Sequence, residues 1–103
     1  MLLEVREVSR KTPRDGRLEI TEESARRLAA LGSFAVEVGP QQSGGAISAL
    51  ACQCEKGGGA AGHMHHFLES PLFTALVSGE TVVLELLDGP VVSVARAHPL
   101  RPE

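Results

Sequence analysis

The sequence predicts a mostly β domain of the α+β class, a small antiparallel barrel or curled sheet of about seven strands capped by one helix. Three observations predict this fold. Apolar and polar residues alternate with period two in several short segments, as in half-buried strands. Gly- and Pro-containing turns separate these segments, which favours antiparallel pairing of successive strands. One segment has the apolar spacing of a helix.

The expected strands are short and evenly distributed. In chain order they cover residues 2–8, 17–20, 33–38, 46–54, 63–69, 81–87 and 91–96. The expected connections are a turn over 9–16, a loop over 39–45, a Gly-rich connection over 55–62, a single helical turn from Pro71, and a loose tail over 98–103. Asp88-Gly89-Pro90 is a strong hairpin signal between the last two strands.

The helix is predicted over residues 22–31. Thr21 is a suitable N-cap, because a threonine hydroxyl can accept a hydrogen bond from a backbone N–H of the first turn. Two glutamates follow in that turn, where the positive end of the helix dipole favours them. Gly32 stands where a C′ glycine is expected to end the helix.

Composition limits the class of protein. Apolar residues make up 43% of the 103, so residues 1–103 are expected to form a single domain with one core. The longest apolar run is too short for a membrane span, and the N-terminus turns acidic after Leu3, so we expect a cytoplasmic protein without a membrane partner. With only two cysteines, the chain is not a disulfide scaffold.

Cysteine and histidine are concentrated in one segment. Both cysteines and three of the four histidines lie within residues 52–66, in the order Cys52, Cys54, His63, His65 and His66. Side chains two residues apart share a face of a strand. If 46–54 and 63–69 pair as a hairpin, one register sets Cys54 opposite His63, Cys52 opposite His65 and Leu50 opposite Phe67.

That arrangement would bring two thiolates and two imidazoles to one side of the sheet. Zinc favours this ligand set and binds it tetrahedrally, either with four protein ligands or with three and a water. Other transition metals are alternatives, since Cu(I) accepts thiolates and Fe or Ni accepts imidazoles. His66 and Glu69 are further candidates for a ligand or base, although this register turns His66 to the opposite face. Cysteines buried in a core, histidines on the surface, or a redox thiol pair would explain the same residues without a metal.

The same region also resembles a known family. Gly57, the pair His63 and His65, and then Glu69 are similar to the start of the first conserved motif of cupins, and the following TALVSGETVVLEL resembles its end. Cupins are small β-barrel proteins whose His-x-His and Glu bind a metal. The resemblance therefore implies a β-barrel with His63, His65 and Glu69 at a metal site.

Three functions remain open on these observations. The first is a binding module stabilised by zinc, whose partner is a protein or a nucleic acid. Basic residues that could contact phosphates are Arg6, Arg10, Lys11, Arg14 and Arg17. A solvated turn between two strands is the interpretation that we favour for this basic stretch, and a chain with three Phe and no Trp or Tyr has few rings for stacking bases.

The second function is a small cupin-like metalloenzyme with an open metal site, in which zinc activates a water and Glu69 is the base. The third is a metal sensor or carrier that binds the ion reversibly. The sequence contains no P-loop or nucleophile motif that would favour catalysis. An exposed edge strand over 2–8 would in addition allow homo-oligomer formation.

Overall fold

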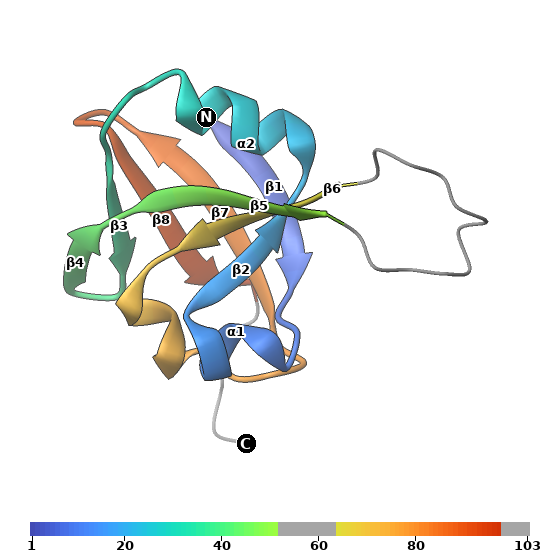
Figure 1. The fold of residues 1–103 in the computed structure, drawn as a ribbon. Helices are drawn as coiled ribbons and strands as arrows, with labels where there is room; N and C mark the ends of the chain where they lie inside the picture. The colour runs from blue at the N-terminus through green and yellow to red at the C-terminus, as the bar shows by residue number, and fades with distance from the viewer. Residues whose placement is uncertain (52–63, 98–103) are drawn as a thin grey trace.

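The computed structural model describes residues 1–51 and 64–97. Over these residues the chain forms two β-sheets that face each other across one core (Figure 1). The described strands are β1 (Leu2–Glu7), β2 (Arg17–Ile20), β3 (Ala35–Val38), β4 (Gln41–Gly44), β5 (Ala46–Ala51), β6 (Met64–Glu69), β7 (Thr81–Leu87) and β8 (Val91–Arg96). The described helices are α1 (Lys11–Asp15), α2 (Glu22–Ala29) and the 3-10 helix η2 (Pro71–Ala75).

The mostly β character is confirmed, but the strands do not close into a barrel. One sheet has the order β1-β7-β8-β3-β4 and the other the order β2-β6-β5. All described pairs are antiparallel except β3 and β8, which run parallel. The expected antiparallel pairing of successive strands would place β3 beside strands that precede or follow it directly in the chain. Instead β3 follows α2 and joins the far side of the β7–β8 hairpin.

Two segments predicted as irregular contain regular structure. The turn over 9–16 includes α1, whose Thr12 is fully buried, and the loop over 39–45 includes β4. Neither segment has a local apolar pattern from which its structure could be predicted. Instead, α1 is held by packing against β2 and η2, and β4 by its ladder with β3. The expected single helix therefore has a short companion.

The main helix begins as predicted. The Thr21 side chain accepts a hydrogen bond of 3.2 Å from the Ser24 backbone N–H, and Glu22 and Glu23 occupy the first turn. The helix ends at Ala29, with Ala30 as its C-cap. It is therefore two residues shorter than the predicted helix over 22–31, and Gly32 is not its C′ residue. Gly32 has a φ of +80° in the turn that follows, a conformation that suits glycine.

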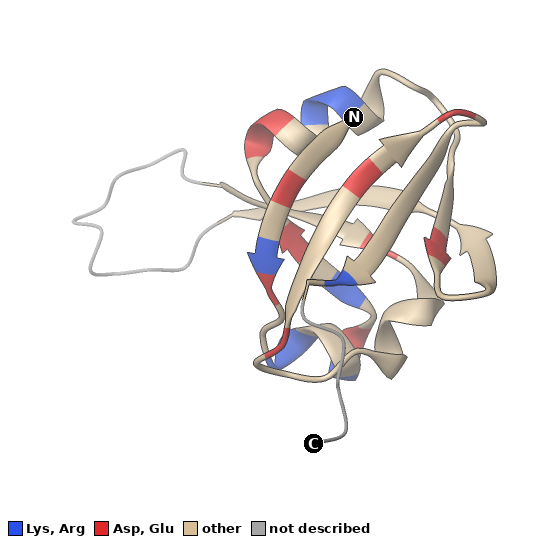
Figure 2. Cartoon of the chain, turned by 180° about the vertical axis from the view of Figure 1, so that it is seen from behind, with Lys and Arg blue, Asp and Glu red and all other residues tan. Residues whose placement is uncertain are grey.

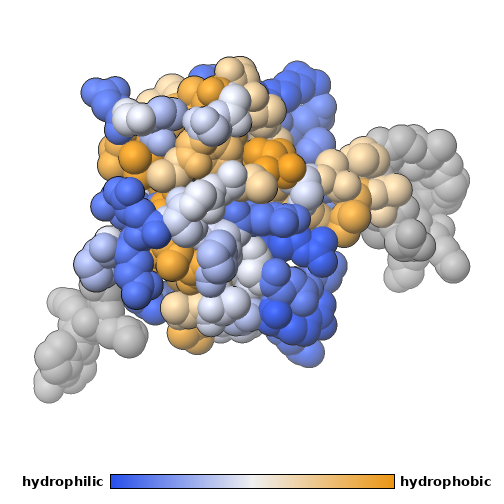
Figure 3. All heavy atoms as spheres, turned by 60° about the vertical axis from the view of Figure 1, so that its left-hand side comes forward, coloured by the Kyte–Doolittle hydropathy of each residue, from blue (hydrophilic) through white to orange (hydrophobic). Residues whose placement is uncertain are grey.

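The core lies between the two sheets and under α2. Alternate residues of each strand point inward, as the burial of Leu18 and Leu68 on one sheet and of Val82, Leu84 and Val92 on the other shows. Apolar side chains also reach the surface, and Figure 3 shows them between hydrophilic groups when the β3–β4 side comes forward. Among the described residues no helix is long and apolar enough to cross a membrane.

Candidate metal centre

The β5–β6 hairpin predicted to carry the metal ligands is present as an antiparallel pair. Its register, however, differs from the expected one by two residues, because Leu50 lies opposite His65 and Phe67 lies opposite Ser48. The prediction that His65 faces Cys52 across the ladder is therefore wrong. The Gly-rich connection alone did not specify the register of the two strands. The observed register places buried Leu68 opposite half-buried Ile47, so that apolar side chains of the two strands meet on the core side.

His65 lies on the outer face of the three-stranded sheet and contacts an acidic side chain from the neighbouring strand. Its Nδ1 is 2.7 Å from the Oε2 of Glu19 in β2. Both side chains are partly exposed. An ionised carboxylate only accepts hydrogen bonds, so Nδ1 carries the proton in this contact, and a neutral ring then has its lone pair on Nε2. Metal-bound histidines usually have this arrangement, with a carboxylate fixing the ring and its tautomer.

His66 points to the other face of the sheet. It lies opposite Ala49 in β5 and Ile20 in β2, and Ile20 belongs to the core. Adjacent residues of a strand alternate between faces, so His65 and His66 do not converge on one ion. This agrees with the orientation expected for His66 and leaves it without support as an additional ligand.

Glu69 shares the outer face with His65 but lies four residues further along β6. At about 3.3 Å per residue the two backbones are roughly 13 Å apart at these positions. Glu69 Oε2 accepts a hydrogen bond of 2.5 Å from the Ser48 hydroxyl, while His65 contacts Glu19. The ligand pair that the cupin resemblance implies, His65 with Glu69, is therefore not brought together. The base proposed from the sequence is likewise distant from His65.

Cys52, Cys54 and His63 lie outside the described residues. Within residues 1–51 and 64–97 no group of three or more His, Cys, Asp or Glu side chains is close enough to hold a metal ion. What the structure describes of the predicted centre is thus His65 and its carboxylate partner Glu19.

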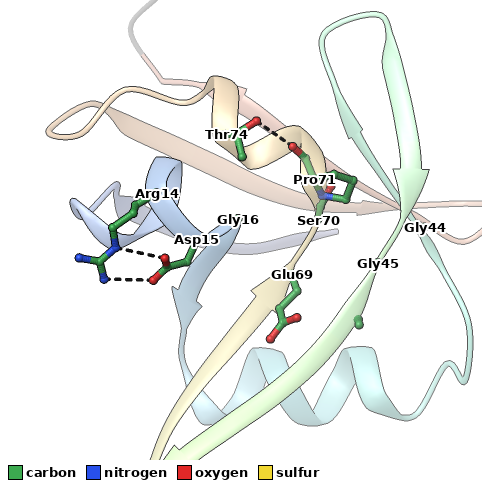
Figure 4. Close-up of a pocket in the computed structure, with 10 residues that line it drawn as sticks. Arg14, Asp15, Gly16, Gly44, Gly45, Glu69, Ser70, Pro71 and Thr74 are labelled. Atoms are coloured by element: carbon green, nitrogen blue, oxygen red, sulfur yellow. Dashed lines mark hydrogen bonds and ion pairs between the residues drawn. The ribbon is translucent and has the colours of Figure 1, made fainter.

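An open cleft of about 520 Å³ lies near Glu69, between the end of α1, the β4–β5 corner and η2 (Figure 4). Three glycines line it, namely Gly16, Gly44 and Gly45. Its polar side chains already have partners: the Arg14 guanidinium binds Asp15, the buried Ser70 hydroxyl lies 2.7 Å from that of Ser43 in β4, and Glu69 binds Ser48 in β5. We assign no ligand to this cleft.

The predicted basic stretch is largely neutralised by neighbouring acids. Arg6 Nε lies 2.9 Å from the Glu4 carboxylate. The hydrogen bond between Arg14 and Asp15 raises the pKa of the guanidinium and lowers the pKa of the carboxyl. Arg17 contacts the same Asp15 at 3.6 Å.

Two further cations of this stretch form no ion pair within 4.0 Å in the part of the chain that the structure describes, although the charge of Lys11 contributes to the lowered pKa of Asp15. Arg10 and Lys11 are exposed at the start of α1. Arg17, in contrast, lies with its guanidinium 5.3 Å from the centre of the Phe67 ring, which is itself almost fully buried. A continuous basic surface for phosphates is therefore not present over the described residues.

Glu19 is the residue of the candidate site that the sequence analysis missed. It stands in the middle of a predicted strand, where an acid is usually a solvent-facing residue. The only feature of the sequence that could have indicated Glu19 was its position in the strand 17–20, on the face opposite to the apolar Leu18 and Ile20. The pairing of β2 with β6, rather than with a sequence neighbour, brings it beside His65.

Comparison of the chain with models of known protein families, with curated proteins and with solved structures finds no match.

Proposed function

We propose that the chain is a small β domain that binds one zinc ion through Cys52, Cys54, His63 and His65, and that acts as a binding module for a partner protein. The observation that carries this proposal is the contact between His65 Nδ1 and Glu19 Oε2 at 2.7 Å. It supplies the outer carboxylate that orients a metal-bound imidazole. The two thiols and second imidazole are the complementary ligands that zinc favours.

The position of the contact supports the same conclusion. Within the described residues the β5–β6 ladder extends to the pair Ala51 and Met64, one residue beyond the pair that contains His65. Paired strands keep these two backbones within about 5 Å. Ala51 and Met64, the described residues that flank the other three ligands in the sequence, therefore both lie next to the pair that contains His65. Closing a loop with a metal removes conformational entropy from the unfolded chain, which is a stabilising use for zinc.

A protein is favoured over a nucleic acid as the partner. Three of the five basic residues that could contact phosphates have acidic neighbours within 4.0 Å, and the chain carries a net charge of -3. A net negative domain repels the phosphate backbone unless its cations are gathered on one surface.

Metal analysis of the purified full chain tests the zinc site. We expect one zinc per chain, and cobalt substitution should give the charge-transfer absorption of bound thiolates. The Cys52→Ser/Cys54→Ser double variant should lose both signals. His98→Ala removes a histidine that is remote from the segment in sequence and serves as the matched control, which should bind zinc as the natural chain does.

Two results would overturn the zinc site: a chain that retains no zinc and shows no cobalt–thiolate band on titration, or a double cysteine variant that binds as tightly as the natural chain. X-ray absorption then separates a closed site of four protein ligands from an open one with a bound water. Only the open site would be compatible with metal-assisted hydrolysis.

A further inference from the structure

The outer face of the five-stranded sheet is arranged in rows that run across the strands. The register aligns three such rows over the sheet: Val5, Val83 and Ala95; then Glu85, Ser93 and Glu37; then Leu87, Val91 and Ala35. Residues between them point into the core, as buried Val82, Leu84 and Val92 show. An acidic row is thus set between two apolar rows.

This face has no cover in the described chain. No described helix lies in front of it in Figure 2, which views the molecule from this side. Val5 is 56% exposed and Leu87 39% exposed. A sheet face normally buries its apolar residues against another layer, so apolar rows left open indicate an interaction surface.

The two glutamates of the middle row, Glu37 and Glu85, have no basic side chain beside them among the described residues. Within the described residues neither Glu37 nor Glu85 forms an ion pair or a side-chain hydrogen bond. No Lys or Arg occupies a described register position on this face, because Arg96 lies opposite the inward Val82 and binds Glu80. Across two strand spacings the two carboxylates are about 10 Å apart, a separation that one or two cations on a partner can span.

We propose that this face binds an amphipathic helix of a partner protein that presents lysine or arginine between apolar residues. Rows two residues apart along a strand are separated by about 7 Å, which equals four to five residues of a helix at about 1.5 Å each. A helix that lies along β7 and β8 could therefore contact all three rows with residues four to five positions apart. Its basic residue would face the acidic row, and the apolar residues on either side would face the two apolar rows. The inference rests on the proposed role as a binding module but not on the zinc site.

Charge argues against the other occupants. If two copies of the chain packed face to face through this surface, Glu37 and Glu85 of each would meet the same carboxylates of the other, and like charges would oppose association. A nucleic acid would bring phosphates against the acidic row with the same result. A basic partner alone gains both apolar burial and charge pairing here.

The test is a titration of the zinc-loaded full chain, followed by NMR, with a synthetic helical peptide of leucine, alanine and lysine at this spacing. A peptide with glutamate in place of lysine is the counterpart. We expect the lysine peptide to perturb residues of β7 and β8 and to bind less tightly as salt is raised. The Glu37→Gln/Glu85→Gln variant should lose about tenfold or more in affinity.

The matched control is Glu22→Gln/Glu23→Gln, which removes two carboxylates from α2 and should leave the affinity unchanged. The proposal is overturned if the lysine peptide does not bind, if it perturbs other elements, or if both double variants bind equally. Equal binding of the glutamate peptide or of a DNA duplex to this face would also overturn it. Zinc counted in the same sample shows separately whether the metal site fails, and the melting temperatures of both variants confirm that they are folded.

Discussion

The Ser24 hydroxyl donates a 2.6 Å hydrogen bond to the carboxylate of Glu4, and so links the first turn of α2 to β1. The same carboxylate accepts hydrogen bonds from the Thr21 backbone N–H at 3.0 Å and the Thr21 hydroxyl at 2.8 Å, and from Arg6 at 2.9 Å. One side chain of an edge strand thus completes the N-terminal cap of the helix. Glu4 also points a charge inward at this edge, which discourages pairing with another strand.

Replacing Glu4 by alanine should destabilise the fold by about 2–3 kcal/mol, because several hydrogen bonds to a charged group are lost and one of their donors, the Ser24 hydroxyl, belongs to a buried residue. Urea unfolding measures this as a lower midpoint with an unchanged slope. Glu7→Ala removes an exposed carboxylate next to Arg6 in the same strand and should change stability by less than about 0.5 kcal/mol. Equal effects of the two variants would refute the capping role of Glu4.

The Glu4 network also predicts a pH dependence. Burial alone would raise the pKa of this carboxyl, but hydrogen bonds from Ser24, Thr21 and Arg6 outweigh burial and lower the pKa below its ordinary 4.5. A lowered folded-state pKa stabilises the fold above the unfolded-state pKa, and this stability is lost as the pH falls through the folded-state value. The unfolding free energy should therefore decrease below about pH 4.5. In Glu4→Gln the decrease should be smaller, and an identical pH profile would contradict the assignment.

Glu19 should act on zinc affinity through His65. Glu19→Gln keeps a hydrogen-bond acceptor beside Nδ1 but removes its charge, and loss of such an outer partner weakens metal binding by about 10–100-fold. Competition with a chromophoric chelator measures the affinity. Glu69→Gln, which changes a carboxylate of the same face bound to Ser48 instead, should leave it within about twofold. Equal loss in both variants would point to a general charge effect rather than to orientation of His65.

Gly45 is required by packing at the β4–β5 corner. A Cβ at this position would lie 2.4 Å from Phe34 Cε1 and 2.7 Å from Val36 Cγ2, both side chains of the core. Gly45→Ala should therefore destabilise the domain by roughly 1–3 kcal/mol through overpacking. At the neighbouring Gly44 a Cβ would meet nothing within 4 Å, so Gly44→Ala is the matched control in thermal unfolding. Similar melting temperatures for the two variants would show that the corner can relax.

Local patterns were sufficient for much of the secondary structure. The strands over 17–20, 81–87 and 91–96 have the predicted bounds, the hairpin turn at 88–90 joins the last two, and Thr21 caps the helix. Each depends on alternation of apolar residues or on turn and cap residues that act within a few positions. Antiparallel pairing of β5 with β6 follows from their closeness in the chain and was predicted as well.

Pairings between distant segments required the tertiary structure. The parallel alignment of β3 with β8 and the pairing of β2 with β6 depend on how the two sheets fill one core. The register that sets Leu50 opposite His65 within the local β5–β6 pair was also left open by the sequence pattern. The contact between His65 and Glu19 joins residues 46 positions apart. The sequence by itself therefore determined which residue types are available for a metal and where most strands lie. Only tertiary packing decided which side chains meet, because burial of the common core selects among registers that local patterns leave equivalent.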